Sequence, residues 1–267
     1  MELSHILGYA GAMATGFVLG LLGGGGALLS IPVLVYLFKI EASVATGYSL
    51  FLVAITASIG AVQNIREKFI DYTAALYYGI PSVITVFVVR RFVMPSLPKV
   101  FFHINGYAVD KNHFILFVLC LVMFIAAYKM ISSANTNTDD TPHETNHFKL
   151  AFYAIFIGAF LGLVGVGGGF LMVPALIYFA NVSPKKAIGT SLLLVAINSF
   201  IGFAGDVSSS TSIDWKFLCI FSLFSITGVI LGNYAATLIH NNKLKVYFGW
   251  FILVVAILMV VKELFFS

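Results

Sequence analysis

Two clusters of glycine, each inside a long apolar stretch, are the residues of this chain best suited to binding chemistry. Their members are Gly23, Gly24, Gly25, Gly26, Gly167, Gly168 and Gly169. Because glycine costs about 1 kcal/mol in a helix relative to alanine, we expect a helix to break at each cluster. A helix that restarts after a break presents free N–H groups and the positive end of its dipole. This arrangement predicts that the clusters bind an anion.

Polar side chains in the apolar stretches after each cluster could complete such a site with hydroxyl or amide groups. The candidates are Ser49, Thr190, Ser191 and Asn198, with Thr46 and Thr56 as further hydroxyls. For any single Ser or Thr, a hydrogen bond to the preceding turn of its own helix is the commoner role. Glycines also permit close packing between helices, and we favour that interpretation for Gly16, Gly158 and Gly228.

The elements that carry these residues are membrane-spanning helices. Hydrophobic residues make up 60% of the 267 positions and charged residues 10%, against roughly 25% charged in a soluble domain. The apolar residues form about eight segments, and nearly all are long enough for a helix to cross a bilayer. These segments cover residues 6–38, 44–63, 72–94, 114–131, 150–180, 187–204, 217–239 and 246–261. Without the alternation of barrel strands, they predict an all-α, polytopic membrane protein.

An internal repeat divides the chain into two halves. Residues 16–64 align without a gap to residues 158–206, with about 21 identities over about 49 positions. The sequence therefore predicts a first transmembrane repeat over residues 1–131, a polar linker over 132–149 and a second repeat over 150–267, each with four segments. Duplicated halves with a solute near the midplane are a common architecture of secondary transporters.

The first segment of each repeat is too long for one crossing and too short for two. Its helix either continues after the glycine break or turns back as a re-entrant hairpin. If all eight segments cross, about nine basic residues share one face against about six on the other, and the richer face would be cytoplasmic. If the two glycine-rich segments are re-entrant, the repeats are inverted and the basic residues divide about evenly.

Other functions are disfavoured by what the spans contain. Essentially no charged residue is expected inside them, which argues against a carboxylate-lined cation site. An intramembrane hydrolase would need a base near Ser49 or Ser191, and no central His, Lys or Asp is present. We assign Asn64 and Asp206, which occupy equivalent positions in the two repeats, to helix capping or solvation at the interface. The sequence predicts no enzyme, no metal site, no cofactor and no nucleic-acid partner.

The doubled pattern Gly-x-x-x-Gly-x-x-Gly-x-Gly-Gly-[Gly/Ala] followed by Pro and then Gly-[Thr/Tyr]-Ser-Leu resembles the sulfite exporter TauE/SafE family of membrane permeases. The second copy, from Gly158 to Pro174 with Ala187 to Leu192, is the closer match. The first copy departs from it, with Ala27 in place of Gly169 and Tyr48 in place of Thr190. The resemblance covers residues 6–261. It implies transport of sulfur-containing and related organic anions, such as sulfite, sulfoacetate or thiosulfate, coupled to an ion gradient.

Together these observations predict a multi-pass secondary transporter in the inner cell membrane that exports small sulfur-containing or related organic anions. The partners implied are an anionic solute, the bilayer and a coupling ion, either a proton or sodium. In the leading hypothesis the two repeats rock to expose the anion alternately to each side. The alternatives are an anion channel of the same architecture and a divalent-cation carrier that uses backbone carbonyls.

Overall fold

The fold is a bundle of helices with one small β-hairpin, which confirms the predicted all-α class. The computed structural model describes residues 2–22, 29–98, 100–104, 107–132, 147–165, 168–208, 213–236 and 241–265. The elements of the first half are α1 (Glu2–Leu22), α2 (Ser30–Pro32), η2 (Val33–Leu37), α3 (Ala42–Arg66), α4 (Tyr72–Val88), η3 (Val89–Val93), α5 (Met94–Ser96), β1 (Val100–Ile104), β2 (Tyr107–Asp110) and α6 (Lys111–Ser132). Those of the second half are α7 (His147–Val164), α8 (Gly169–Ala180), α9 (Pro184–Ser208), α10 (Trp215–Ala236) and α11 (Asn241–Phe265).

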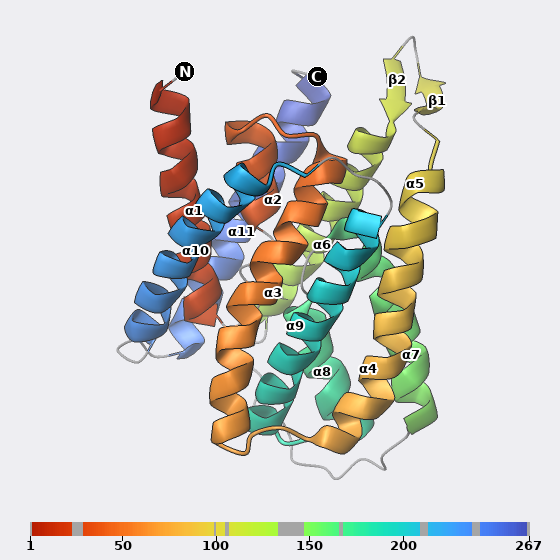
Figure 1. Cartoon of the computed structure of the whole chain (residues 1–267), viewed down its shortest axis with the longest axis vertical. Helices are drawn as coiled ribbons and strands as arrows, with labels where there is room; N and C mark the ends of the chain where they lie inside the picture. The colour runs from red at the N-terminus through yellow and green to blue at the C-terminus, as the bar shows by residue number, and fades with distance from the viewer. Residues whose placement is uncertain are drawn as a thin grey trace.

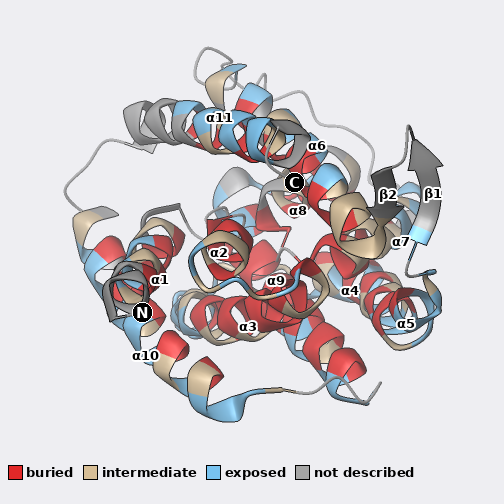
Figure 2. Ribbon diagram, turned by 90° about the horizontal axis from the view of Figure 1, so that it is seen from above, coloured by how far each residue is buried: buried red, intermediate tan, exposed pale blue. Residues whose placement is uncertain are grey.

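Helices α3 and α9 pack along each other at the centre of the bundle, where most of their residues are buried (Figure 2). Around them α1 packs along α10, α4 along α7, and α6 along α11. In the first two of these pairs, the first helix of one predicted repeat packs against the helix of the third segment of the other repeat. The division at residues 131 and 150 stays a prediction, but these contacts join the two halves closely.

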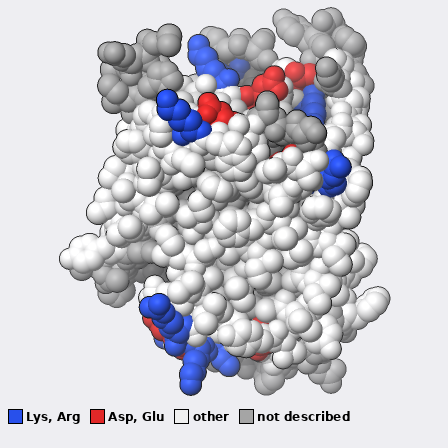
Figure 3. Space-filling model, viewed as in Figure 1, with Lys and Arg blue, Asp and Glu red and all other residues white. Residues whose placement is uncertain are grey.

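The outer surface is apolar in its middle and charged at its two ends. On the face drawn in Figure 3, Lys, Arg, Asp and Glu of the described residues gather at both ends, and the belt between them is free of charge. By length and composition, four described helices could cross a membrane: Ala42–Arg66, Tyr72–Ser96, Lys185–Ser208 and Trp215–Gly232. Helices α6 and α11, with 22 and 25 residues, are about 33 and 38 Å long and also exceed a hydrocarbon core of about 30 Å. The chain is a multi-pass membrane protein.

The first glycine-rich segment turns back on itself. Tyr9, near the start of α1, packs against Phe38, which follows η2, with ring centroids 5.5 Å apart. Gly11 likewise faces Val33 and Leu37. Since the start of α1 contacts the end of η2, the chain returns to the end of the bundle where it began (Figure 1). Gly23 to Gly26, where we expect the break, lie outside the described residues.

The second glycine-rich segment makes the same turn from the opposite end of the bundle. Helix α7 ends at Val164 and α8 begins at Gly169, so the expected break is present. Gly165 and Gly168 have φ angles of +72° and +67°, a region that side chains disfavour. Tyr153 in α7 packs against Phe179 in α8 at 5.1 Å. Both segments are thus re-entrant hairpins, and they enter the bundle from opposite ends (Figure 1).

Two matching hydrogen bonds tie the halves together near the two ends of the bundle. The backbone N–H of Asp71, which precedes α4, donates to the hydroxyl of Thr190 in α9 at 2.9 Å. The N–H of Asp214, which precedes α10, donates to the hydroxyl of Tyr48 in α3 at 2.8 Å. Tyr48 and Thr190 are equivalent positions in the sequence alignment. Each half therefore fixes the start of a helix in the other half.

The stretch between α5 and α6 forms a β-hairpin. Strands β1 and β2 pair antiparallel, with His103 opposite Ala108 and Ile104 opposite Tyr107. Residues 105 and 106, between the two strands, lie outside the described residues. Most of the predicted linker, residues 133–146, also lies outside the described residues.

Gly16 allows α1 to approach α10 closely, as the packing interpretation predicts. A Cβ at this position would lie 2.0 Å from the carbonyl oxygen of Ser225. We expect Gly16→Val to lower the free energy of unfolding by about 1–3 kcal/mol, because the two backbones must separate. Thermal unfolding in detergent measures the change. Ala14→Val, on the exposed face of α1, is the control, and an equal loss in both variants would contradict the prediction.

Candidate functional site

A buried ion pair joins the two halves beside the second helix break. Arg90 lies in η3, and its side chain is 0% exposed. Its Nη1 donates to Oδ2 of Asp206 in α9 at 3.0 Å and to Oγ1 of Thr46 in α3 at 3.0 Å. The pair connects residues 116 positions apart. Ionisable side chains inside membrane segments generally mark a solute or ion pathway, so this pair is the first candidate for function.

The Arg90 guanidinium has unused donors. A guanidinium carries five N–H groups, and Nε and Nη2, which hold three of them, find no acceptor among the described residues. Among the described residues, this side chain bonds only through Nη1, to Asp206 and Thr46. A buried donor without an acceptor costs about 1–3 kcal/mol. Three such donors on one cation make this side chain a candidate for binding an anion.

The helix break lies directly against this guanidinium. A Cβ at Gly165 would lie 2.5 Å from Nη2 of Arg90 and 2.5 Å from the carbonyl oxygen of Thr46. Only glycine fits at this position, because its φ is +72° and because a side chain would clash with these atoms. Helix α8 begins four residues further on, at Gly169, and its first N–H groups lack partners within the helix. The break that precedes α8 thus lies against a buried cation.

A cavity of about 120 Å³ opens beside the ion pair. Its lining residues come from α3, η3, α5, α6 and α9: Ser43, Val44, Arg90, Met94, Pro95, Lys111 and Asp206. Lys111, the first residue of α6, donates from Nζ to the carbonyl oxygen of Met94. The preceding residue, Asp110, accepts from the N–H of His113 at 2.9 Å, which caps α6. Two cations and one carboxylate therefore line one small space.

The Asp110 carboxyl stays ionised to a lower pH than an ordinary aspartate. Partial burial opposes this by favouring the protonated form, but hydrogen bonds from the backbone and the ring of His113 outweigh it, so the pKa of Asp110 lies below its ordinary value. A carboxylate at the start of a helix also interacts favourably with the helix dipole. The cap keeps the first turn of α6, with Lys111, in place at the edge of the cavity.

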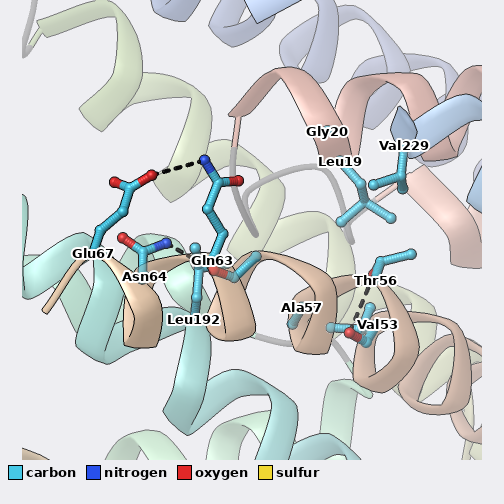
Figure 4. A pocket seen from close by; sticks show the side chains of 11 residues that line it. Leu19, Gly20, Val53, Thr56, Ala57, Gln63, Asn64, Glu67, Leu192 and Val229 are labelled. Atoms are coloured by element: carbon cyan, nitrogen blue, oxygen red, sulfur yellow. Dashed lines mark hydrogen bonds between the residues drawn. The ribbon is translucent and has the colours of Figure 1, made fainter. Parts of the chain in front are cut away.

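A second cavity, of about 170 Å³, lies toward the other end of α3 (Figure 4). Gln63, Asn64 and Glu67 form its polar side, and Gln63 donates to Glu67 at 3.1 Å. Leu19 and Gly20, near the end of α1, also line it. Each cavity therefore lies near the inner end of a re-entrant hairpin. No described residue lines both cavities.

The two cavities differ at equivalent positions. A Cβ on Gly47 would lie 2.6 Å from Oδ2 of Asp206, and a Cβ on Gly189 would lie 2.9 Å from Oδ1 of Asn64. Asn64 aligns with Asp206, and Gly47 aligns with Gly189. The same contact between the halves thus occurs twice, with a carboxylate at one end and an amide at the other.

Of the predicted glycines, two lie at the second break. Gly168 precedes α8, Gly169 is its first residue, and both are buried. Gly167 lies outside the described residues, as do the four glycines of the first cluster. A Cβ on Gly168 would overlap the side chain of Leu161 in α7, at 2.3 Å, so this glycine also serves the turn of the hairpin.

The predicted polar side chains do not gather in one place. Ser49 is fully buried and hydrogen-bonded to Ser30, Oγ to Oγ, at 2.6 Å. Asn198 exchanges two hydrogen bonds with Ser82 of α4, at 3.2 and 3.1 Å. Both pairs are buried in the core between helices. Their role as solute ligands stays a prediction.

Thr190 and Ser191 make the bonds expected of structural hydroxyls. Thr190 accepts the N–H of Asp71, and Ser191 donates to the carbonyl oxygen of Ile188, one turn back in its own helix, at 2.8 Å. Thr46, in contrast, contacts Arg90 directly. Among the hydroxyl candidates, Thr46 is therefore the one that the structure places in the ion-pair site.

The expectation that the spans hold essentially no charge is wrong for Arg90 and Asp206. Both lie in helices long enough to cross a membrane, and both are buried. The assignment of Asp206 to capping or solvation is corrected with it, because its carboxylate binds Arg90. One signal was present in the sequence: Arg90 follows an apolar stretch of 18 residues from Tyr72 without a break that would end the helix. Its partner could not be found from spacing.

Comparison with known proteins gives a consistent result. The sulfite exporter TauE/SafE family matches residues 8–259. A probable membrane transporter protein of Xylella fastidiosa (strain 9a5c) is 29% identical over 91% of this chain and 89% of its own length. A probable membrane transporter protein of Haemophilus influenzae is 28% identical over 94% of this chain and 96% of its own, and YunE of Bacillus subtilis, which has the same description, is 26% identical over 87% of each. No solved structure matches the chain.

Proposed function

The chain belongs to the sulfite exporter TauE/SafE family of membrane transporters, and we propose that it is a secondary transporter that exports small sulfur-containing or related organic anions, such as sulfite. We further propose that residues 1–131 and 150–267 act as the two moving repeats and that the protein resides in the inner cell membrane. Its activity is then transport rather than catalysis.

The observation that carries this proposal is the set of unused donors on Arg90. The Nε and Nη2 edge of a guanidinium matches two oxygens of a carboxylate or of an oxoanion such as sulfite. In Arg90 this edge has no acceptor among the described residues. Nη2 lies against Gly165 at the break that precedes α8. An anion bound there would satisfy all of these donors together.

The same site disfavours a divalent-cation carrier. Arg90 and Lys111 line the cavity with Asp206 as the sole carboxylate among its lining residues. A divalent cation would meet two positive charges and one negative, and it prefers several oxygen ligands. The balance of charge favours an anion at this position.

Two features support alternating access over an open channel. The two cavities lie toward opposite ends of α3 and share no described lining residue. Between them the core is closed by side-chain pairs such as Ser82 with Asn198. The re-entrant hairpins also enter from opposite ends, which is the arrangement that inverted repeats produce in many secondary transporters.

Solute exchange in proteoliposomes tests the proposal. Vesicles loaded with sulfite, thiosulfate or sulfoacetate are diluted into the same labelled anion, and uptake is measured against concentration. We expect uptake to saturate and to be accelerated by anion on the opposite side, because a carrier must return. Uptake that rises linearly with concentration, and that anion on the opposite side does not accelerate, would indicate a channel. Thermal stabilisation by divalent cations alone, with none by any anion, would overturn the proposal.

A further inference from the structure

The charged groups that line the cavity beside Arg90 leave one net positive charge. From this we propose that the site selects monovalent over divalent anions and that Asp206 is the residue that sets this selectivity. The inference rests on the proposed anion transport and adds the charge state of the solute, so that hydrogensulfite is expected to be preferred over the divalent thiosulfate and sulfoacetate. It depends on the geometry of one ion pair, whose two partners come from η3 and α9.

Among the described residues, three ionisable side chains line this cavity. They are Arg90 from η3, Lys111 from α6 and Asp206 from α9, while α3 contributes only Ser43 and Val44. Glu41, which precedes α3, is near Lys111 but exposed to solvent and does not line the cavity. Its charge is screened by water and salt more than the buried ones. Two cations and one carboxylate therefore decide the charge of the empty site.

Asp206 can remain in place when an anion binds. It is bonded to Nη1, which Thr46 shares, whereas the unused donors belong to Nε and Nη2. An anion on that edge would then share one guanidinium with the Asp206 carboxylate. A monovalent anion makes the buried site neutral. A divalent anion leaves an uncompensated negative charge, which the low dielectric of the interior strongly disfavours.

Methanesulfonate and sulfate are suitable probes, because both are tetrahedral and carry one and two negative charges at neutral pH. Each is titrated against the purified wild-type protein by thermal shift and as a competitor of sulfite uptake. We expect methanesulfonate to bind at least about tenfold more tightly than sulfate, since one unpaired charge at close range inside a protein is worth that much or more. This comparison needs no variant.

Asp206→Asn provides the second measurement. The amide oxygen can still accept a hydrogen bond from Arg90, but the site gains one positive charge. We expect sulfate to bind about tenfold more tightly than in the wild type, so that the preference for methanesulfonate is lost. Asp214→Asn is the matched control: Asp214 caps α10 by accepting from Phe217 at 3.0 Å, Asn caps equally well, and the residue lies outside the cavity.

The outcomes separate this inference from the proposed function. If sulfite and methanesulfonate bind but sulfate binds equally well to the wild type, the charge selectivity is wrong and the anion transport stands. If no anion binds at all, the proposed function itself fails. A sulfate affinity that is unchanged in a folded Asp206→Asn protein would likewise overturn the role of Asp206. If that variant does not fold, the wild-type comparison decides.

Discussion

Replacing Arg90 with Gln is expected to reduce anion uptake in proteoliposomes by about 100-fold or more, since truncating one partner of a buried charged contact costs about 2–5 kcal/mol. Arg90 is fully buried, and its unused Nε and Nη2 are the donors that we assign to the solute. Arg90→Lys keeps the charge but loses the two-pronged geometry. We expect it to retain only weak uptake, between that of the wild type and that of Arg90→Gln.

The control for this prediction is Arg91→Gln, one position along the same π-helical segment. Arg91 is partly exposed and lies over the ring of Phe92 at 5.8 Å. We expect the rate of uptake by Arg91→Gln to stay within about twofold of the wild type, because isolated exposed cation–π contacts contribute only about 0.5–1 kcal/mol. Equal loss of uptake in the two variants would show that the charge of this segment, rather than the Arg90 site, matters.

Stability must be followed separately from transport in these variants. Arg90→Gln leaves the Asp206 carboxylate without its cation, and breaking a buried pair in this way costs about 3–5 kcal/mol. The double variant Arg90→Gln with Asp206→Asn removes both charges. We expect it to recover most of the thermal stability and none of the transport. Recovery of transport in the double variant would contradict an anion-binding role for Arg90.

Replacing Gly165 with Ala is expected to abolish uptake and to lower the free energy of unfolding by about 2–5 kcal/mol, from backbone strain and overpacking together. The residue has a φ of +72°. The new methyl group would also overlap Nη2 of Arg90 and the backbone of Thr46, both at 2.5 Å. The hairpin would have to withdraw from the guanidinium, which separates the helix break from the cation.

Gly11→Ala is the matched control for Gly165→Ala. Gly11 lies inside α1 with a helical backbone, and its nearest neighbours are the side chains of Val33 and Leu37, at 3.1 Å. Side chains at that distance can shift, and alanine favours the helix by about 1 kcal/mol. Thermal unfolding and uptake are compared for both variants. Normal uptake by Gly165→Ala would exclude the close approach at the break from the mechanism.

Much of the architecture is predictable from the sequence, because it depends on local properties. Apolar length predicts the spans, and the run of glycines around Gly168 predicts the break that separates α7 from α8. The direction of the chain after each break is not predictable, since it depends on contacts such as Tyr9 with Phe38. The π-helical segment that carries Arg90 also has no sequence signal of its own.

The candidate site is less predictable than the fold, because its central residues are far apart in the chain. From its position near the end of an apolar stretch, Arg90 is predicted to be a charge at the membrane interface, and Asp206 is predicted to cap a helix. Only packing of α4 and η3 against α9 brings them to 3.0 Å. The matched context of Thr190 and Ser191 predicts solute ligands, whereas the structure shows both hydroxyls bonded to backbone groups, Thr190 to Asp71 and Ser191 to Ile188; their role in binding stays a prediction.

The crossed packing of the halves affects the order in which the protein can fold. Helix α1 is synthesised before the other described helices, yet its main partner α10 follows after roughly 190 residues of chain. At about 5–20 residues per second, α1 waits about 10–40 s for this partner during synthesis. Helix α4 waits a much shorter time for α7, which follows about 60 residues later. The first hairpin, although it leads the chain, can therefore reach its final position only after most of the second half has entered the membrane.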